Sequence, residues 1–257
     1  RTDKPRALLR YWYSHRTRLC ESTVVTQVWP RQSAARVRDL PAWTPPSKPP
    51  LPAAMFGFNL DLLDQLSFYG SYHRNFYNKL VHLVFVPGIA WSTMVWLAAT
   101  GSLLGEDVHF GAALTRWGVP AVLASGAVPN LSMAVAAMYT GYYVALEPVA
   151  GATWAVVVGI PLWLSATAFQ AASAPHAWAW ALGVHVLSWY AQIHPGHLIL
   201  ERRRPAITDS VFQSLVLAPL FVWIEVLFAC GYRPELCAEV GRRIDLRVRV
   251  MDAGKNK

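Results

Sequence analysis

Charged side chains are scarce in this sequence. They make up 15% of the 257 residues, and hydrophobic residues make up 54%, whereas roughly 25% of the residues in globular proteins are charged. The scarcity is greatest between Trp117 and Leu200, where Glu147 is the only charged residue. A water-soluble domain cannot solvate so long a stretch with one charge, but a membrane protein can, because its outer surface faces lipid.

Cysteine is also rare, and its pattern excludes two classes of site. Cys20, Cys230 and Cys237 form no C-x-x-C pair, and the spacing of the last two fits no zinc motif. We therefore expect neither a disulfide framework nor a cysteine-bound zinc ion, and we interpret all three as structural residues.

The net charge of +8 comes from basic residues placed away from the hydrophobic middle. They occupy the first forty residues, "ERRRP" (201–205) and "GRRIDLRVR" (241–249). Because they flank hydrophobic segments and do not line one polar face, we predict no nucleic-acid partner. They are either solvated flanks or contacts to anionic headgroups, so membrane lipid is the expected partner.

Three regions follow from this pattern. Residues 1–57 form a basic, Pro-rich leader, in which the six prolines of "LPAWTPPSKPPLPAAM" exclude a helix and favour an extended chain. Its many arginines and few acids are typical of the surroundings of an organellar cleavage site. Residues 58–235 form a helical membrane domain, and residues 236–257 form a basic C-terminal tail.

Hydrophobic periodicity predicts an all-α, polytopic membrane fold. Residues 58–78 carry apolar side chains at steps of three and four, which is typical of an amphipathic helix lying in the membrane interface. We expect about five transmembrane helices after it, with four to six compatible with the pattern. The five segments are about 80–104, 119–146, 149–169, 175–193 and 211–230.

Four crossings would bring the start of the first span and the end of the fourth to one membrane face. That face, cytosolic or matrix-like by the positive-inside tendency, would hold two groups of histidines. A single interfacial histidine is usually an anchor, but several together with a carboxylate suit iron, zinc or manganese. Two histidines facing each other would also suit haem. The candidates on this face are His73, His82, His194, His197 and Glu201.

Two ionisable residues lie deeper in the apolar segments. His185 is twelve residues before His197, about 18 Å along a straight helix, so we interpret it as structural. Glu225, in "FVWIEVLF", has either a function or a structural hydrogen bond, as is usual for such residues in apolar helices.

Two blocks of sequence carry a family resemblance. "FYGSYHRNFYNKLVHLVFVP" and "WYAQIHPGHLILERRRPAITDSVFQSLVLAPLFVWIEVLF" resemble a family of small membrane proteins that includes a fungal 2-hydroxy fatty acid dioxygenase of the endoplasmic reticulum. The resemblance covers about residues 58–235. The family pattern falls on Tyr72-His73, Asn78, His82, Gly196-His197, Glu201 and Arg204-Pro205-Ala206.

The resemblance implies an Fe(II)-dependent α-oxidation in the endoplasmic reticulum membrane. A 2-hydroxy fatty acid and O₂ as co-substrate would give the fatty acid one carbon shorter. The resemblance assigns the metal to His73, His82 and His197, and His194 is a further candidate ligand. Three such ligands leave open positions, as oxygenase iron requires.

The same resemblance implies roles for three charged residues. Glu201 would be either a metal ligand or the acceptor that orients a ligating histidine. Arg203 or Arg204 would pair with the carboxylate of the substrate.

A second interpretation comes from another class of protein, a non-catalytic accessory subunit of a large membrane complex. Such a complex would be mitochondrial, for example a respiratory complex or the ATP synthase of the inner membrane. The Arg-rich leader favours it, with residues 1–57 contacting other subunits, and so does His194, which is an insertion relative to the family pattern. Fold alone does not decide between the two functions.

Overall fold

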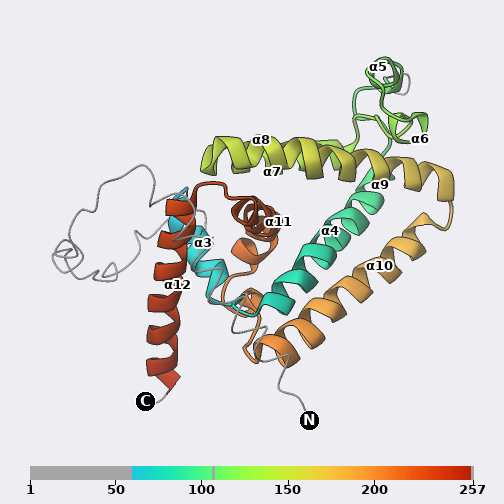
Figure 1. Cartoon of the computed structure of the whole chain (residues 1–257). Coiled ribbons are helices and arrows are strands. Elements are labelled where there is room, and N and C mark those ends of the chain that lie inside the picture. The colour runs from blue at the N-terminus through green and yellow to red at the C-terminus, as the bar shows by residue number, and fades with distance from the viewer. Residues whose placement is uncertain (1–59, 106–107, 256–257) are drawn as a thin grey trace, which may run out of the picture.

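The computed structural model describes residues 60–105 and 108–255 (Figure 1). Within these ranges every regular element is helical and there is no strand, which confirms the all-α prediction. The leader, residues 1–57, lies outside the described residues. The contacts expected of it with other subunits therefore stay predictions.

The predicted interfacial helix, residues 58–78, is two helices. Helix α3 (Leu62–Gly70) begins after Asp61, whose carboxylate accepts two backbone N–H groups of the first turn. Helix α4 (Phe76–Ala98) begins after Asn75, whose side chain does the same. Such caps satisfy donors that have no partner inside the helix. The apolar spacing continues across both helices, so periodicity alone does not reveal the turn between them.

In the part of the chain that the structure describes, two helices are long and apolar enough to cross a membrane. One is α4, and the other is the continuous helix Pro148–Ser173. The five-span prediction is therefore not confirmed, because no other helix of the described residues is both long enough and apolar enough. The long helix consists of α8 (Pro148–Trp154), the π-helical turn η2 (Ala155–Gly159) and α9 (Ile160–Ser173).

The second predicted span, residues 119–146, is interrupted. It contains the short helix α6 (Ala121–Ala124) and the separate helix α7 (Leu131–Leu146). Asn130 stops the apolar run, because its side chain accepts the N–H of Met133 and so begins a new helix. Hydropathy counts these residues as one segment because the turn itself is uncharged.

The remaining elements complete the chain. Helix α10 runs on without a break into the π-helical segment η3, and α12 occupies most of the region that we predicted as a basic tail. The bounds are α5 (Gly111–Arg116), α10 (Ala177–Ala191), η3 (Gln192–Glu201), η4 (Ala206–Thr208), α11 (Val211–Ala229) and α12 (Pro234–Lys255).

The helices form two packed groups that share α4. On one side α4 packs against α9 and α10, and α10 runs beside it in Figure 1. On the other side α3, α7, α8, α11 and α12 enclose a core that includes Leu66, Tyr69, Tyr143, Trp154 and Leu220. Because η3 also packs on α4, the first turns of α4 lie between both groups.

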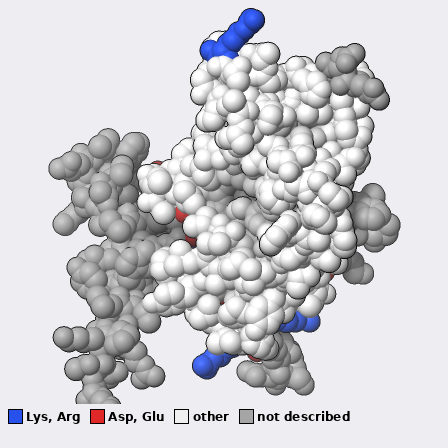
Figure 2. Space-filling model, turned by 90° about the vertical axis from the view of Figure 1, so that its right-hand side faces the viewer, with Lys and Arg blue, Asp and Glu red and all other residues white. Residues whose placement is uncertain are grey.

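The outer surface supports membrane association. Figure 2 shows a broad face almost without charge, with Lys and Arg at its upper and lower ends. Large apolar side chains are exposed on the long helices, including Val156, Trp178 and Trp180, which are 62% to 67% exposed. Apolar exposure of this extent marks a surface that a partner or a bilayer covers.

Candidate metal centre

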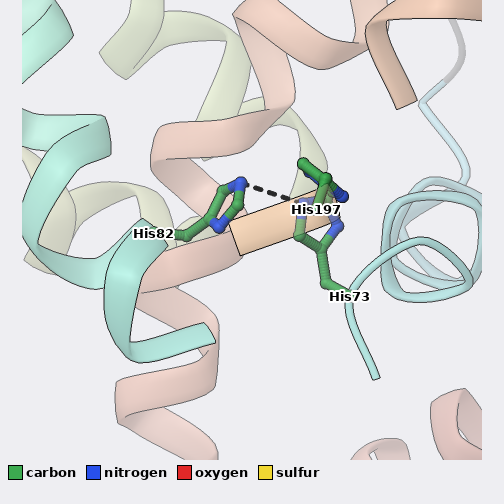
Figure 3. Close-up of side chains that lie close together, drawn as sticks. All are labelled: His73, His82 and His197. Carbon is green, nitrogen blue, oxygen red and sulfur yellow. Dashed lines mark hydrogen bonds between the residues drawn. The ribbon is translucent and has the colours of Figure 1, made fainter. Parts of the chain in front are cut away.

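Three histidines from three elements converge near the start of α4 (Figure 3). His73 comes from the turn between α3 and α4, His82 from α4, and His197 from η3. One ring nitrogen of each lies within 4.8 Å of the corresponding atoms of the other two. All three side chains are buried, with exposed fractions between 1% and 4%.

The backbone fixes the tautomers of two of these rings. Nδ1 of His73 lies 2.8 Å from the carbonyl oxygen of Tyr69, and Nδ1 of His82 lies 2.9 Å from that of Asn78. A carbonyl oxygen only accepts, so each Nδ1 donates, and Nε2 of each neutral ring carries a lone pair. The two Nε2 atoms face each other at 3.2 Å. Two lone pairs at this distance repel unless a proton or a cation lies between them.

Burial keeps the rings of His73 and His197, which lie outside the candidate span α4, in their neutral form. It lowers the pKa of His73 well below its usual value and lowers that of His197 to about 4, because burial disfavours the charged form. Nδ1 of His197 is buried and has no hydrogen-bond partner among the described residues. Neutral imidazoles with free lone pairs are the form that binds metal ions, so the three residues fit a metal.

The π-helical segment η3 brings His197 against α4. Gly196 allows the close approach, because a Cβ atom there would lie 2.7 Å from Oδ1 of Asn78. On the other side of the site the ring of Tyr69 stacks on His73, with 4.2 Å between the ring centroids. π-Helical turns are frequent at functional sites.

Glu201 hydrogen-bonds to the segments that carry His73 and His82. Its carboxylate accepts the backbone N–H groups of Arg74 and Asn75 at 2.9 and 2.8 Å, and Nδ2 of Asn78 at 3.2 Å. These bonds join the end of η3 to the turn that carries His73. None of these donors is a histidine ring, so both roles expected of Glu201, metal ligand and acceptor from a ligating histidine, stay predictions.

The structure does not bring His194, Arg203 and Arg204 to the three histidines. His194 is exposed and stacks on Tyr190, whereas His197 on the same segment is buried. Arg203 pairs with Asp252 at 3.0 Å, and Arg204 pairs with an acid on its own loop. Neither arginine lines the cavity described below, so their proposed contact with a substrate stays a prediction.

A cavity of about 230 Å³ begins at the three histidines and follows α4. Its wall on α4 extends from His82 to Met94, a rise of about 18 Å along the helix. None of the lining residues is charged, and the rest of the wall comes from α3, α7, α8, α10, η3, η4 and α11. The cavity is therefore apolar along α4 and has one end at the histidines.

Partly buried polar contacts account for the two deeper ionisable residues. His185 bonds through Nδ1 to the hydroxyl of Ser92 and accepts from Nε1 of Trp189, as its structural interpretation requires. Glu225 forms an ion pair with Lys79 at 2.6 Å, which joins α11 to α4. Sequence reasoning missed Lys79, although its place one residue after Asn78 in the first turn of an apolar helix was a signal.

Fold and site together define an all-helical protein with a buried three-histidine group at the end of an apolar cavity. The chain belongs to the Mpo1-like family, described as 2-hydroxy-palmitic acid dioxygenase Mpo1-like, whose model matches residues 60–230. This confirms the resemblance found in the sequence.

One relative matches over most of both chains. The protein is 30% identical over 190 residues to the 2-hydroxy-palmitic acid dioxygenase MPO1 of Saccharomyces cerevisiae, which covers 74% of this chain and 93% of that protein. No solved structure matches the chain.

Proposed function

We propose that this protein is an Fe(II)-dependent dioxygenase that shortens 2-hydroxy fatty acids by one carbon. The observation that carries the proposal is the pair of Nε2 atoms of His73 and His82, which face each other at 3.2 Å with both Nδ1 atoms bonded to carbonyl oxygens. Metal-ligating histidines are oriented in this way by a bond from their other nitrogen. Membership of the Mpo1-like family supports the reaction.

Different residues of the chain would bind the polar head and the acyl tail of the substrate. His73, His82 and His197 would hold the metal and leave positions for the 2-hydroxyl and carboxylate oxygens. When bound, Fe(II) would supply the activation of O₂. The uncharged wall along α4 would take the acyl tail and exclude water from the histidines. Atoms and electrons balance if the carboxyl carbon leaves as CO₂ together with one water.

The membrane is the source of substrate that the surface favours. A long-chain 2-hydroxy fatty acid is an amphiphile that partitions into bilayers, and the uncharged face of Figure 2 would lie in one. The endoplasmic reticulum is the compartment that the family resemblance implies. The mitochondrial inner membrane belongs to the alternative of an accessory subunit, which depends on residues 1–57.

Metal analysis of the purified protein tests the proposal. Wild type prepared without oxygen should hold about one iron per chain, and His82→Ala combined with His197→Ala should hold none. His194→Ala is the matched control, because this histidine lies outside the group. The iron-loaded wild type should convert 2-hydroxypalmitic acid with O₂ to the acid one carbon shorter.

The outcomes separate the proposal from its alternatives. Absence of stoichiometric metal from wild type would refute the dioxygenase and leave the accessory subunit. A Soret band would indicate haem, which the geometry disfavours because three rings converge with centroids only 4.4 to 5.1 Å apart.

A further inference from the structure

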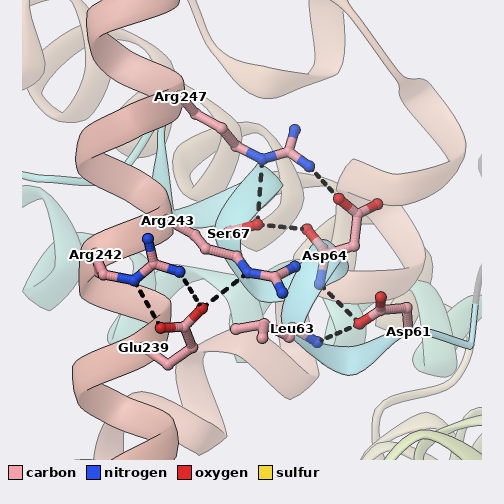
Figure 4. A network of polar contacts seen from close by, with 8 residues as sticks. All are labelled: Asp61, Leu63, Asp64, Ser67, Glu239, Arg242, Arg243 and Arg247. Carbon is pink, nitrogen blue, oxygen red and sulfur yellow. Dashed lines mark hydrogen bonds and ion pairs between the residues drawn. The ribbon is translucent and has the colours of Figure 1, made fainter. Parts of the chain in front are cut away.

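Helix α12 lies beyond residue 230, where the match to the family model ends, yet it packs against the helix that leads to His73 (Figure 4). Its apolar residues recur every four positions and form one stripe, which joins the core around α3. Val240 and Val248 in this stripe are 5% and 4% exposed. The full stripe is Leu236, Val240, Ile244 and Val248.

One residue of this stripe contacts the end of α3, the segment that leads to His73. Ile244 lies over Gly70, where an added Cβ atom would be 2.4 Å from its Cδ1 atom. The carbonyl oxygen of Gly70 accepts the backbone N–H of His73 at 3.1 Å. The preceding residue, Tyr69, both stacks on His73 and accepts from its Nδ1 atom. α12 therefore contacts the end of α3 that fixes this ring.

Two ion pairs extend from α12 to the loops beside the histidines. Asp245 pairs at 2.8 Å with Arg74, the residue that follows His73. Asp252 pairs at 3.0 Å with Arg203, whose backbone N–H donates to the carbonyl oxygen of His197 at 3.3 Å. One helix thus holds a residue adjacent to His73 and a residue bonded to His197.

Further polar contacts fix the register of α12 on α3. Arg247 donates through Nε to the hydroxyl of Ser67 at 3.1 Å and also pairs with Asp64. By contrast, Glu239 pairs with Arg242 and Arg243 of α12 itself. The same helix therefore offers both pairs that reach the site and pairs that do not.

We propose that α12 is a clamp that positions His73 and His197, with Asp245 and Asp252 as its positioning residues. The inference rests on the proposed metal site. Each of these ion pairs is partly exposed, and such pairs contribute little to global stability. Their loss should therefore loosen the two loops and weaken metal binding, without a matching loss of fold.

The test compares two variants of the full-length protein. Asp245→Asn with Asp252→Asn removes both pairs at constant side-chain size, and Glu239→Gln is the control on the same helix. The double variant should bind Fe(II) about tenfold more weakly, in the range found for residues that support metal ligands. The control should bind like wild type, and without metal both variants should keep the wild-type helical content and unfolding midpoint.

Hydrogen exchange on the metal-free proteins gives a readout that does not depend on metal. Amides of residues 71–75 and of Arg203 should exchange faster in the double variant and at the wild-type rate in the control. Exchanging the charges, Arg74→Asp with Asp245→Arg, should restore slow exchange in the first loop.

Two failures are distinguishable. Wild-type exchange and wild-type affinity in the double variant would overturn the clamp. If wild type itself binds no Fe(II), the proposed function fails, and the exchange rates alone decide whether α12 holds the loops.

Discussion

Two histidine environments in this protein differ in how the second ring nitrogen is used. In His185 both nitrogens bond to side chains, those of Ser92 and Trp189. In His73 and His82 one nitrogen bonds to a carbonyl oxygen and the other faces its counterpart. A ring with two neutral partners is satisfied, whereas two opposed lone pairs need a cation. A structural histidine and a candidate metal ligand therefore differ in whether the second ring nitrogen has a hydrogen-bond partner.

Removal of one ring of the group should have the largest effect. We expect His73→Gln to abolish stoichiometric iron and all turnover, because an amide does not place a nitrogen lone pair where Nε2 was. Elemental analysis and product formation measure the two results. Retention of one iron per chain by this variant would contradict the assignment of His73 as a ligand. His73 would then be no more a ligand than His185.

A separation of the elements that carry the rings should have the next largest effect. In Gly196→Ala the added methyl group would meet Oδ1 of Asn78 at 2.7 Å, so η3 or the Asn78 side chain must shift where His197 packs against α4. We expect iron affinity to fall by about tenfold to a hundredfold, since support of the ligands matters nearly as much as the ligands. Gly183→Ala is the control, because an added Cβ atom there meets nothing within 4 Å.

Substitution of Glu201, which supports the turn that carries His73, should cause a smaller loss of iron affinity. Glu201→Gln keeps the shape but replaces the carboxylate, so charge-assisted bonds from Arg74 and Asn75 become neutral or are lost. We expect about tenfold weaker iron binding, measured by titration under nitrogen. Unchanged affinity with wild-type activity would show that the turn carrying His73 is held without this residue.

Substitution of the structural histidine, His185, should affect the stability of the fold alone. We expect His185→Ala to keep one iron per chain and to lose about 1 kcal/mol of unfolding free energy, because Ser92 and Trp189 each lose a partly buried hydrogen-bond partner. Denaturant unfolding in detergent and elemental analysis on the same sample measure both quantities. Loss of the iron would mean that this ring reaches the site indirectly.

The sequence predicted which histidines meet better than how they meet. The motifs around His82 and His197 were sufficient to identify the family and to group these two residues, whereas their common membrane face stays a prediction. The outward position of His194 depends on the π-helical register of η3, which the spacing of residues does not encode. The tautomers depend on which carbonyl oxygens face the rings.

The fold was predictable to a similar extent. Apolar periodicity identified an all-helical chain, yet it joined helices that Asn75 and Asn130 separate, because a capping side chain does not change the hydrophobic count. The packing of α12 was not predictable locally, since Arg247 finds its partner Asp64 across most of the described chain. Contacts of that range depend on the whole fold.

The three histidines come from two segments that are far apart in the sequence, 73–82 and the region of His197. A metal bound by all three would therefore be a cross-link that exists only in the folded chain. Anything that binds the folded state alone stabilises it by mass action, by about 2.7 kcal/mol at a free concentration of one hundred times Kd. Iron supply would then set the amount of folded protein as well as its rate of turnover.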